Sequence, residues 1–279
     1  MSNTDLLKNF TGTILLADAP PELAALVQEY LAKGGFLKGT IDGKVGPITM
    51  TAFHAFKKAN QLGDLDYLGK STAEALVKLG SVIQPTSTKL DVDYFYQRDN
   101  STNLFGTGDR QCKLTCSAML AHHLLKSAGL KDLRQLQKEG GYKEPESVYA
   151  QHLKKYGDTI YNEPHIKALK DLSISAYYKQ KLGLEGLIQL LQKDIPVPLS
   201  IDYKQGGHIV LAVGYNADKN FFWIHDPYGS RDAAAHRYRD RSPLAGRYDT
   251  YSWDLLNKLW ANYWNGHALI ATAVGGKSL

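Results

Sequence analysis

The sequence is poor in cysteine and has no long hydrophobic run. Its 279 residues include two cysteines, too few for the disulfide framework that holds small secreted domains together. No segment approaches the roughly 20 consecutive apolar residues of a membrane span. The first residues also lack the basic start and the apolar stretch of a signal peptide. We therefore expect no membrane span, and we expect the chain to remain in the cytoplasm of the cell that makes it.

Charged residues of neither sign dominate the composition. Lys and Arg number 33, and Asp and Glu number 28, which gives a formal net charge of +5. No basic cluster with interleaved aromatic residues is present, so the sequence does not predict a nucleic-acid partner. Hydrophobic residues make up 43% of the chain, as in globular proteins, and the length allows a large core plus a smaller module. We expect a monomer that needs no cofactor and no metal.

A short internal repeat organises the first 80 residues. A helix is predicted to begin at Pro20 and Pro21 and to end at Gly34 and Gly35. Each copy of the repeat then predicts a tight turn followed by a helix, with Thr49 or Thr72 at or near the N-cap. Three such short helices form a bundle too small for elaborate chemistry. The copies are Gly39-x-Ile41-Asp42 with Val45-Gly46-x-x-Thr49-x-x-Ala52-Phe53, and Gly63-x-Leu65-Asp66 with Leu68-Gly69-x-x-Thr72-x-x-Ala75-Leu76.

These residues resemble a known family. The stretch DGKVGPITMTAFHAF, from Asp42 to Phe56, is similar to the central motif of the three-helix peptidoglycan-binding domain of bacterial and phage cell-wall hydrolases. The resemblance covers residues 20 to 79 and implies that peptidoglycan is a partner, with Asp42 and Gly46 as substrate-binding candidates. It departs at Lys57, where glutamine is usual. The alternative is that Asp42 and Gly46 only build the turn.

A polar stretch then separates this module from the rest of the chain. Such a composition is typical of an interdomain linker. We therefore expect a peptidoglycan-binding domain at residues 1–84 and a second domain at residues 85–279. The linker residues are Ser81, Gln84, Pro85, Thr86, Ser87 and Thr88.

Cys112 is the candidate nucleophile of the second domain. The run from Leu114 to Leu125 has no Pro or Gly and is mostly apolar, which predicts a helix that begins at or just after Cys112. A thiol in the first turn lies among unpaired N–H groups, which favour the thiolate. Cys116, one turn further in, is more typical of a small buried apolar residue.

A lone cysteine is weak evidence, and a metal site is an alternative reading. Cys112 and Cys116 could be two ligands on one helical face, with His122 or His123 as a third. The sequence contains no Cys-x-x-Cys pair, and structural zinc usually needs four ligands in paired clusters. Metal binding is therefore disfavoured.

A base and its orienting acid are predicted on a hairpin. Strands are expected at residues 195–201, 206–215 and 221–227, the last two joined by a turn. His208 and Asp226 are nearly equidistant from that turn, which would bring a carboxylate to the imidazole. Together with Cys112 they would supply a nucleophile, a base and an orienter. His225 is an alternative base, although strand alternation turns it to the opposite face. Gln97 is a neutral amide upstream that could stabilise an oxyanion.

A second resemblance covers most of residues 90 to 264. It lies in motifs that are similar to those of papain-like cysteine peptidases related to the bacteriocin-leader-processing branch. By this likeness Gln97 is the oxyanion donor, Cys112 the nucleophile, His208 the general base and Asp226 its orienting partner. Lys113-Leu114 stand where many relatives have Gly-Pro. The motifs are Tyr96-Gln97, Cys112-x-x-Thr115-x-Ser117-Ala118-Met119, Gly207-His208-Ile209-Val210-x-x-Val213-Gly214-Tyr215 and Asp226-Pro227-Tyr228-Gly229.

The rest of the second domain is less specific. Helices are expected at residues 131–138, 145–156, 164–172, 184–192 and 253–264, and a final strand at 267–274. The segment from Tyr228 to Asp249 is rich in Arg and Tyr, and Tyr228 and Arg231 are candidates for clamping a peptide carboxylate. A solvated charged loop is the alternative.

Together these features predict a two-domain α+β protein, in which a small three-helix bundle precedes a papain-like domain with a helical lobe and an antiparallel sheet. The expected function is that of a phage endolysin-like, antimicrobial peptidoglycan hydrolase that cleaves wall peptide bonds after release from the producing cell. Three alternatives stay open. They are an N-acetylmuramoyl-L-alanine amidase with the same triad, a non-catalytic wall-binding protein and a leader-peptide processor.

Overall fold

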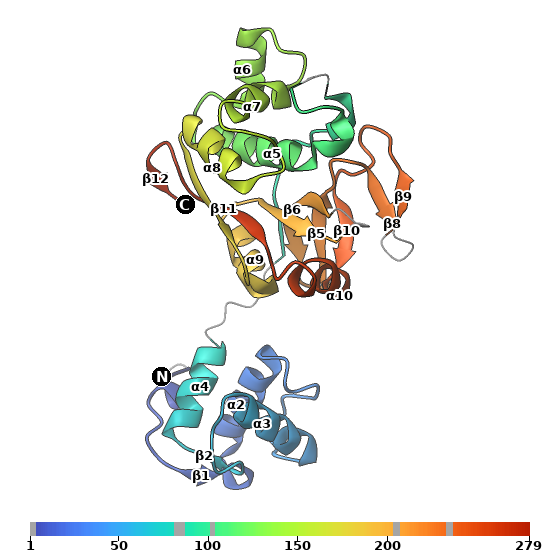
Figure 1. The fold of residues 1–279 in the computed structure, drawn as a ribbon. Coiled ribbons are helices and arrows are strands. Elements are labelled where there is room, and N and C mark those ends of the chain that lie inside the picture. The colour runs from blue at the N-terminus through green and yellow to red at the C-terminus, as the bar shows by residue number, and fades with distance from the viewer. Residues whose placement is uncertain (1–3, 81–86, 101–103, 203–206, 233–236) are drawn as a thin grey trace. The chain divides into compact units, whose positions relative to one another are not determined.

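The computed structural model describes residues 4–80, 87–100, 104–202, 207–232 and 237–279 (Figure 1). The chain divides into two compact units, residues 1–84 and 85–279, and each unit has its own hydrophobic core. Most of the predicted linker, residues 81–86, lies outside the described ranges. None of the helices within those ranges combines the length and the apolar character that a membrane crossing requires.

The first unit is a small helical bundle. Its three longer helices turn apolar stripes inward, so that Leu31, Phe53, Phe56 and Leu76 are fully buried. The predicted first helix is confirmed, with Pro21 at its start and Gly34 as its C-cap. The elements are α1 (Thr4–Lys8), β1 (Ile14–Leu15), η1 (Leu16–Asp18), α2 (Pro21–Lys33), α3 (Pro47–Ala59), β2 (Tyr67–Leu68), antiparallel to β1, and α4 (Lys70–Gly80).

The repeated threonines lie near the starts of their helices, as predicted, but inside the first turn. Gly46 is the N-cap of α3, and Thr49 is buried in the first turn, where its hydroxyl accepts a hydrogen bond from Gln28 Nε2 (3.1 Å). Thr72 is likewise buried in the first turn of α4. Both threonines face the core because the repeat places them on the apolar stripe.

Lys57 has a structural role in this bundle. It is 2% exposed, and its ammonium donates to the carbonyl oxygens of Asp64 (2.5 Å) and Tyr67 (2.6 Å). Burial lowers its pKa. The side chain therefore ties α3 to the turn that precedes β2 and to the first residue of β2.

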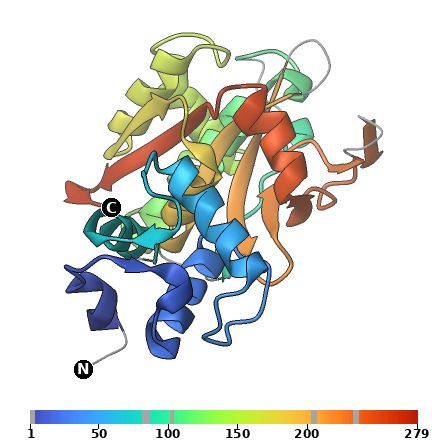
Figure 2. The same cartoon turned by 90° about the horizontal axis from the view of Figure 1, so that it is seen from below.

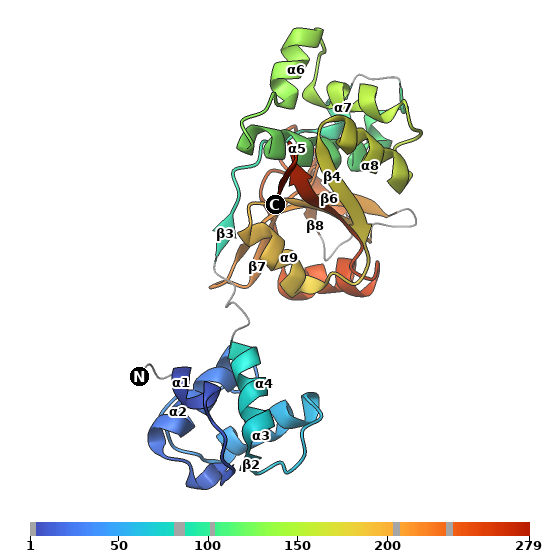
Figure 3. The same cartoon turned by 90° about the vertical axis from the view of Figure 1, so that its left-hand side faces the viewer.

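The second unit is an antiparallel sheet with helices on both faces, which confirms the predicted α+β class (Figures 1 and 3). The strand order is β10-β7-β6-β5-β11-β12, with β3 beside β6 and β4 beside β11. The strands of this sheet are β3 (Thr88–Lys89), β4 (Ile174–Lys179), β5 (Val197–Ile201), β6 (His208–Asn216), β7 (Phe221–His225), β10 (Asp249–Ser252), β11 (Ala268–Val274) and β12 (Lys277–Ser278).

Helix α5 (Cys112–Ser127) is the centre of this unit. It packs against β5 and β6, α6 (Leu133–Gly140) and α7 (Pro145–Leu153) lie against it on the side away from the sheet (Figure 1), and α8 (Asn162–Asp171) contacts both α5 and β4. All twelve residues from Leu114 to Leu125 are buried. The helix begins at Cys112, as predicted.

Two further helices cover other parts of the sheet. Helix α9 (Gly183–Gln192) contacts β3, β5 and β6, and α10 (Trp253–Leu256) lies beside β7 and β10 (Figures 1 and 2). The helix predicted for residues 253–264 changes character after Leu256, where a π-helical segment, η4 (Asn257–Asn262), follows.

Several predicted boundaries differ from the structure. β4 lies in a region for which only helices were predicted, and β8 (Ser230–Asp232) pairs with β9 (Arg237–Asp240) inside the predicted Arg- and Tyr-rich loop. β7 ends at His225, two residues earlier than expected. Two short 3-10 turns, η2 (Gln97–Asp99) and η3 (Gly108–Arg110), lead to α5.

Candidate active site

The first turn of α5 presents Cys112 with its neighbouring amides. The first hydrogen bond of the helix runs from the Thr115 N–H to the Gln111 carbonyl oxygen (2.9 Å), so the N–H groups of Cys112, Lys113 and Leu114 have no partner within the helix. These amides and the positive end of the helix dipole favour an anion at this point.

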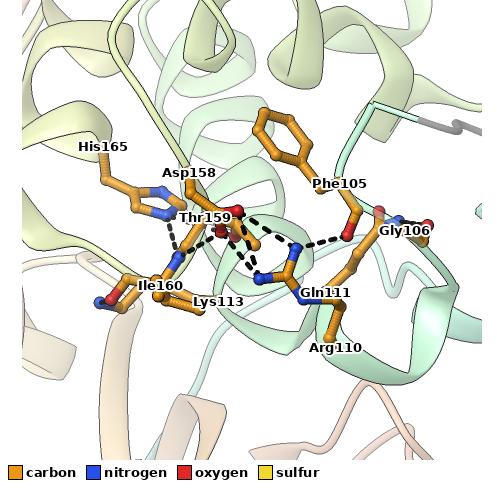
Figure 4. Close-up of polar contacts among 9 residues, drawn as sticks. All are labelled: Phe105, Gly106, Arg110, Gln111, Lys113, Asp158, Thr159, Ile160 and His165. Carbon is orange, nitrogen blue, oxygen red and sulfur yellow. Dashed lines mark hydrogen bonds and ion pairs between the residues drawn. The ribbon is translucent and has the colours of Figure 1, made fainter.

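The segment before Cys112 is fixed by side chains that bond to its own backbone. Gln111 donates from Nε2 to the Gly106 carbonyl oxygen (2.9 Å) and accepts from Asn100 Nδ2 at Oε1 (3.0 Å). Arg110 donates to the Phe105 carbonyl oxygen (2.7 Å), as Figure 4 shows. Because both residues directly precede the cysteine, these bonds set the direction in which the chain enters α5.

His208 and Asp226 form a buried pair. His208 Nε2 lies 2.8 Å from Asp226 Oδ1, and the residues are 6% and 0% exposed. The predicted direct opposition is wrong in detail, because Leu211 is paired with His225 and the register shifts between Ala212 and Gly214. Asp226 therefore falls short of the position opposite His208 by two residues. A shift of two keeps both side chains on one face, so they still meet.

Asp226 is held by several further groups. Its Oδ1 accepts the Tyr228 N–H (2.9 Å) and its Oδ2 accepts the Tyr238 hydroxyl (3.0 Å). Its backbone is fixed as well, because the N–H donates to the Gly246 carbonyl oxygen (3.0 Å) and the carbonyl oxygen accepts the Tyr94 hydroxyl (2.7 Å). The sequence did not identify Tyr238, since its role depends on the unpredicted β8–β9 hairpin.

The electrostatics couple Cys112 to this pair. Burial opposes ionisation of the Cys112 thiol, but the His208 imidazole beside it, to which it hydrogen-bonds, brings the pKa of Cys112 below its ordinary value. Burial likewise opposes charging of His208, but the Asp226 carboxylate and Cys112 raise the pKa of His208 well above its ordinary value. Since Nε2 is bonded to Asp226, Nδ1 is the nitrogen left for sulfur. The arrangement favours a thiolate–imidazolium pair.

Gln97 lies between the two halves of this arrangement. It is fully buried, donates from Nε2 to the Gly108 carbonyl oxygen (2.8 Å), and its backbone N–H donates to the Pro227 carbonyl oxygen (3.0 Å). Through its side chain and its backbone N–H, Gln97 thus joins the turn before Cys112 to the residue after Asp226. An amide nitrogen carries two hydrogens, so one remains beyond the bond to Gly108.

A cavity of about 410 Å³ opens beside Cys112 and His208. Its wall is drawn from α5, the segment before α8, strands β5 and β6, and the segment before β11. Sequence reasoning had not connected the distant parts of this wall, because the chain between them is long. The other lining residues are Arg110, Lys113, Thr159, Ile160, Asn162, Gln180, Ser200, Gly207, Ile209, Trp264 and His267.

The predicted substrate-binding residues of the second domain lie in different surroundings. The ring of Tyr228 is 6.5 Å from that of His208 and is half-buried. Arg231 is 2% exposed, and its guanidinium donates to the Asp202 carbonyl oxygen (3.0 Å). Tyr228 is therefore placed near the candidate triad, whereas the burial of Arg231 does not favour direct contact with a substrate.

Asp42 and Gly46 belong to the first unit, where Asp42 takes part in a turn. Gln28 donates to Asp42 Oδ1 (3.0 Å) and to the Lys44 carbonyl oxygen (2.9 Å), and accepts from the N–H groups of Asp42 (3.0 Å) and Gly43 (2.8 Å). Gly46 ends the turn as the N-cap of α3. This geometry supplies a turn-building role, and ligand contact by Asp42 and Gly46 stays a prediction.

The residues considered as an alternative base or as metal ligands are bonded to, or lie near, other groups in the second unit. His225 bonds through Nε2 to the Val92 carbonyl oxygen (3.0 Å), and burial lowers its pKa to about 4. Cys116 donates to the Ile209 carbonyl oxygen (3.3 Å), and burial raises its pKa. His122 and His123 lie near Asp93 and Asp194, respectively. Within the described ranges, no group of three His, Cys, Asp or Glu residues is placed to hold a metal ion.

Comparison with known proteins gives one family. The model of the Peptidase_C39 like family matches residues 89–256, more than half of the chain. Among solved structures, the chain is similar to a Bacillus anthracis protein provisionally described as a C39-like peptidase, with 14% identity and a TM-score of 0.40 over 69% of this chain and 99% of that chain. No curated protein matches the sequence. The matched range contains Gln97, Cys112, His208 and Asp226.

Proposed function

The chain belongs to the Peptidase_C39-like family, and we propose that it hydrolyses peptide bonds of bacterial peptidoglycan through an acyl-enzyme on Cys112. The family supports cysteine peptidase activity. The observation that carries the assignment of roles is the hydrogen-bonded chain from Asp226 through His208 to Cys112 at the start of α5. This chain supplies an orienting acid, a base and a nucleophile in the order that acyl transfer needs.

The reaction proceeds in two halves. The Cys112 thiolate attacks the scissile carbonyl carbon, and the resulting oxyanion accepts hydrogen bonds from the Cys112 N–H and the Gln97 amide. The His208 imidazolium donates its proton to the leaving amine, which leaves a thioester on Cys112. His208, now neutral, takes a proton from water as the water attacks the thioester, and the carboxylic acid product leaves with the thiolate restored.

The first unit supports peptidoglycan as the substrate. Its repeat resembles peptidoglycan-binding domains of cell-wall hydrolases, and a wall-binding unit keeps the attached enzyme at its polymer. The role that follows is lysis of the bacterial wall, as performed by a phage endolysin. An amidase that cuts between the sugar lactyl group and the peptide would use the same three side chains.

Digestion of purified sacculi tests the proposal. Wild type, Cys112→Ala and, as a matched control, Cys116→Ala are incubated with sacculi, and released fragments are identified by mass spectrometry. Wild type and Cys116→Ala are expected to release fragments with new amino groups, and Cys112→Ala none. Fragment masses separate a peptidase from an amidase. Full activity of Cys112→Ala would exclude Cys112 as the nucleophile. If every variant binds sacculi and none releases fragments, the protein is a non-catalytic wall-binding protein.

A further inference from the structure

Lys113 extends from the first turn of α5 into the wall of the cavity beside Cys112. Its ammonium donates to the Ile160 carbonyl oxygen (3.0 Å) and to Asn162 Oδ1 (2.7 Å), and lies 5.2 Å from the centre of the Tyr178 ring. Figure 4 shows the side chain reaching the Ile160 backbone. All three partners are uncharged. An ammonium has three N–H donors, so one remains beyond these two bonds.

The groups around Lys113 provide no carboxylate for it. Asp158, the nearest acid on the adjoining loop, is bound by Arg110 through contacts of 3.0 to 3.3 Å (Figure 4). Within the described ranges, Lys113 has no ion pair with Asp or Glu, and the cavity lining contains neither residue type. The anionic group that acts on it is the Cys112 thiolate.

The two histidines near Lys113, His267 and His165, are uncharged. Burial, and secondarily the nearby Lys113, lowers the pKa of His267, whose Nδ1 lies 2.8 Å from the Ser200 hydroxyl. Burial lowers the pKa of His165 to about 3, so this imidazole is also neutral at pH 7. Of the other cations among the described residues that line the cavity, Arg110 is paired with Asp158 and His208 with Asp226, whereas the hydrogen-bond partners of Lys113 are neutral.

A partly buried lysine whose hydrogen-bond partners are all neutral is unusual, because a buried charge is normally paired directly with an opposite charge. Burial lowers the pKa of Lys113 to about 8, which leaves it mostly charged at pH 7. A ligand carboxylate in the cavity would supply the missing charge and take up the remaining donor.

We propose that Lys113 is a specificity-determining residue that binds a carboxylate of the substrate beside the scissile bond. The preferred substrates are then peptides whose carboxylate is free, and the corresponding carboxamides are poor substrates. This inference rests on the proposed function for its wall-peptide substrate, but the binding of a carboxylate next to Cys112 can be measured without any hydrolysis.

The test uses alkylation of Cys112 by iodoacetylglycine and by its neutral analogue iodoacetylglycinamide. The two reagents displace iodide in the same way and differ only in the carboxylate. The rate ratio of acid to amide is measured by mass spectrometry of the Cys112 peptide. The ratio cancels differences in the amount of thiolate, and the His208 charge is common to all variants.

In wild type at pH 7, the acid-to-amide ratio is expected to exceed that of Lys113→Met by about tenfold, the effect of one charge-assisted hydrogen bond of moderate strength. Lys131→Met, which removes an exposed lysine paired with Glu139, should leave the ratio unchanged. The preference requires charged Lys113, so in wild type it is full below pH 7 and falls as the pH rises through about 8. In Lys113→Met this fall should be absent.

An equal ratio in wild type and Lys113→Met would overturn the inference. If Lys113→Met does not fold, the pH dependence of the wild-type ratio decides, because a ratio that stays constant between pH 6 and 9.5 also overturns it. The outcomes separate the two proposals. Cleaved sacculi with an unchanged ratio reject the carboxylate site alone, whereas intact sacculi with a Lys113-dependent ratio reject the wall substrate and retain the site.

Discussion

The Asp226→Asn substitution would test how the pair at the start of α5 stays ionised. Asn has nearly the same shape and can still accept the Tyr238 hydroxyl or the Tyr228 N–H, so the fold around it should be retained. What changes is the charge 2.8 Å from His208 Nε2. Burial disfavours a charged imidazole, and Asp226 is the largest influence that compensates.

The magnitude follows from Coulomb's law. Two unit charges about 4 Å apart interact by about 4 kcal/mol at an effective dielectric constant of about 20. Removal of a charge partner at this range typically changes a pKa by about 1–3 units, and each unit corresponds to about 1.4 kcal/mol. We therefore expect the pKa of His208 to fall by about 1–3 units in Asp226→Asn.

The directions of the two pKa shifts define the pH range that the assay must cover. The thiolate–imidazolium pair exists above the lowered pKa of Cys112 and is lost as the pH rises through the raised pKa of His208. In Asp226→Asn the upper limit of this window should move down toward neutral pH. Imidazolium signals in NMR, followed together with thiolate absorbance, measure both limits, and Cys112 alkylation by iodoacetamide checks reactivity. An upper limit that does not move would refute the role given to Asp226.

Three further substitutions have defined outcomes. Gly246→Ala would place a Cβ against the Asp226 carbonyl oxygen, so Cys112 alkylation should slow about tenfold or more, as expected when a catalytic group is displaced. The matched control is Gly63→Ala, whose Cβ would have no atom within 4 Å. Equal alkylation rates in the two variants would contradict the role given to the Asp226 backbone. Gln28→Leu removes four hydrogen bonds to the Asp42 turn and should destabilise the first unit by about 2–4 kcal/mol in denaturant unfolding, with no change in Cys112 alkylation. An unchanged denaturant midpoint would show that the Gln28 hydrogen bonds do not stabilise the first unit. Burial raises the pKa of Glu146 to about 8, so the folded state binds more protons than the unfolded state between pH 4.5 and 8, and stability falls as the pH rises across that window. Glu146→Gln should remove this fall in thermal unfolding, and a persistent pH dependence of the same size would assign it to other groups.

Local patterns were sufficient for the parts of the fold that depend on nearby residues. The start of α5 follows from the contrast between a glycine-rich loop and the apolar run after Cys112, and the hairpin of β6 and β7 follows from two apolar strands around a polar turn. The meeting of His208 and Asp226 needed only that both lie on one face, so an error of two residues in register did not separate them.

Features that depend on distant residues were not predicted. β4 pairs with β11, which follows it by about ninety residues, and no local signal indicates this partner. Tyr238 reaches Asp226 because a small hairpin turns back over the site. The uncharged partners of Lys113 come from two separate segments, since Ile160 and Asn162 lie just before and at the start of α8 and Tyr178 lies in β4, although the position of Lys113 next to Cys112 was visible in the sequence.

The burial of α5 also has a kinetic consequence. Its twelve consecutive buried residues offer no exposed face from which the helix could open by itself, so their hydrogen-bonded amide protons should exchange with solvent only when the whole second unit unfolds. Cys112 is attached to this slowest-exchanging segment. Loss of nucleophile reactivity on heating and loss of the global fold should therefore occur as one cooperative event, with no partly opened form in which the cysteine has left its partners while the sheet persists.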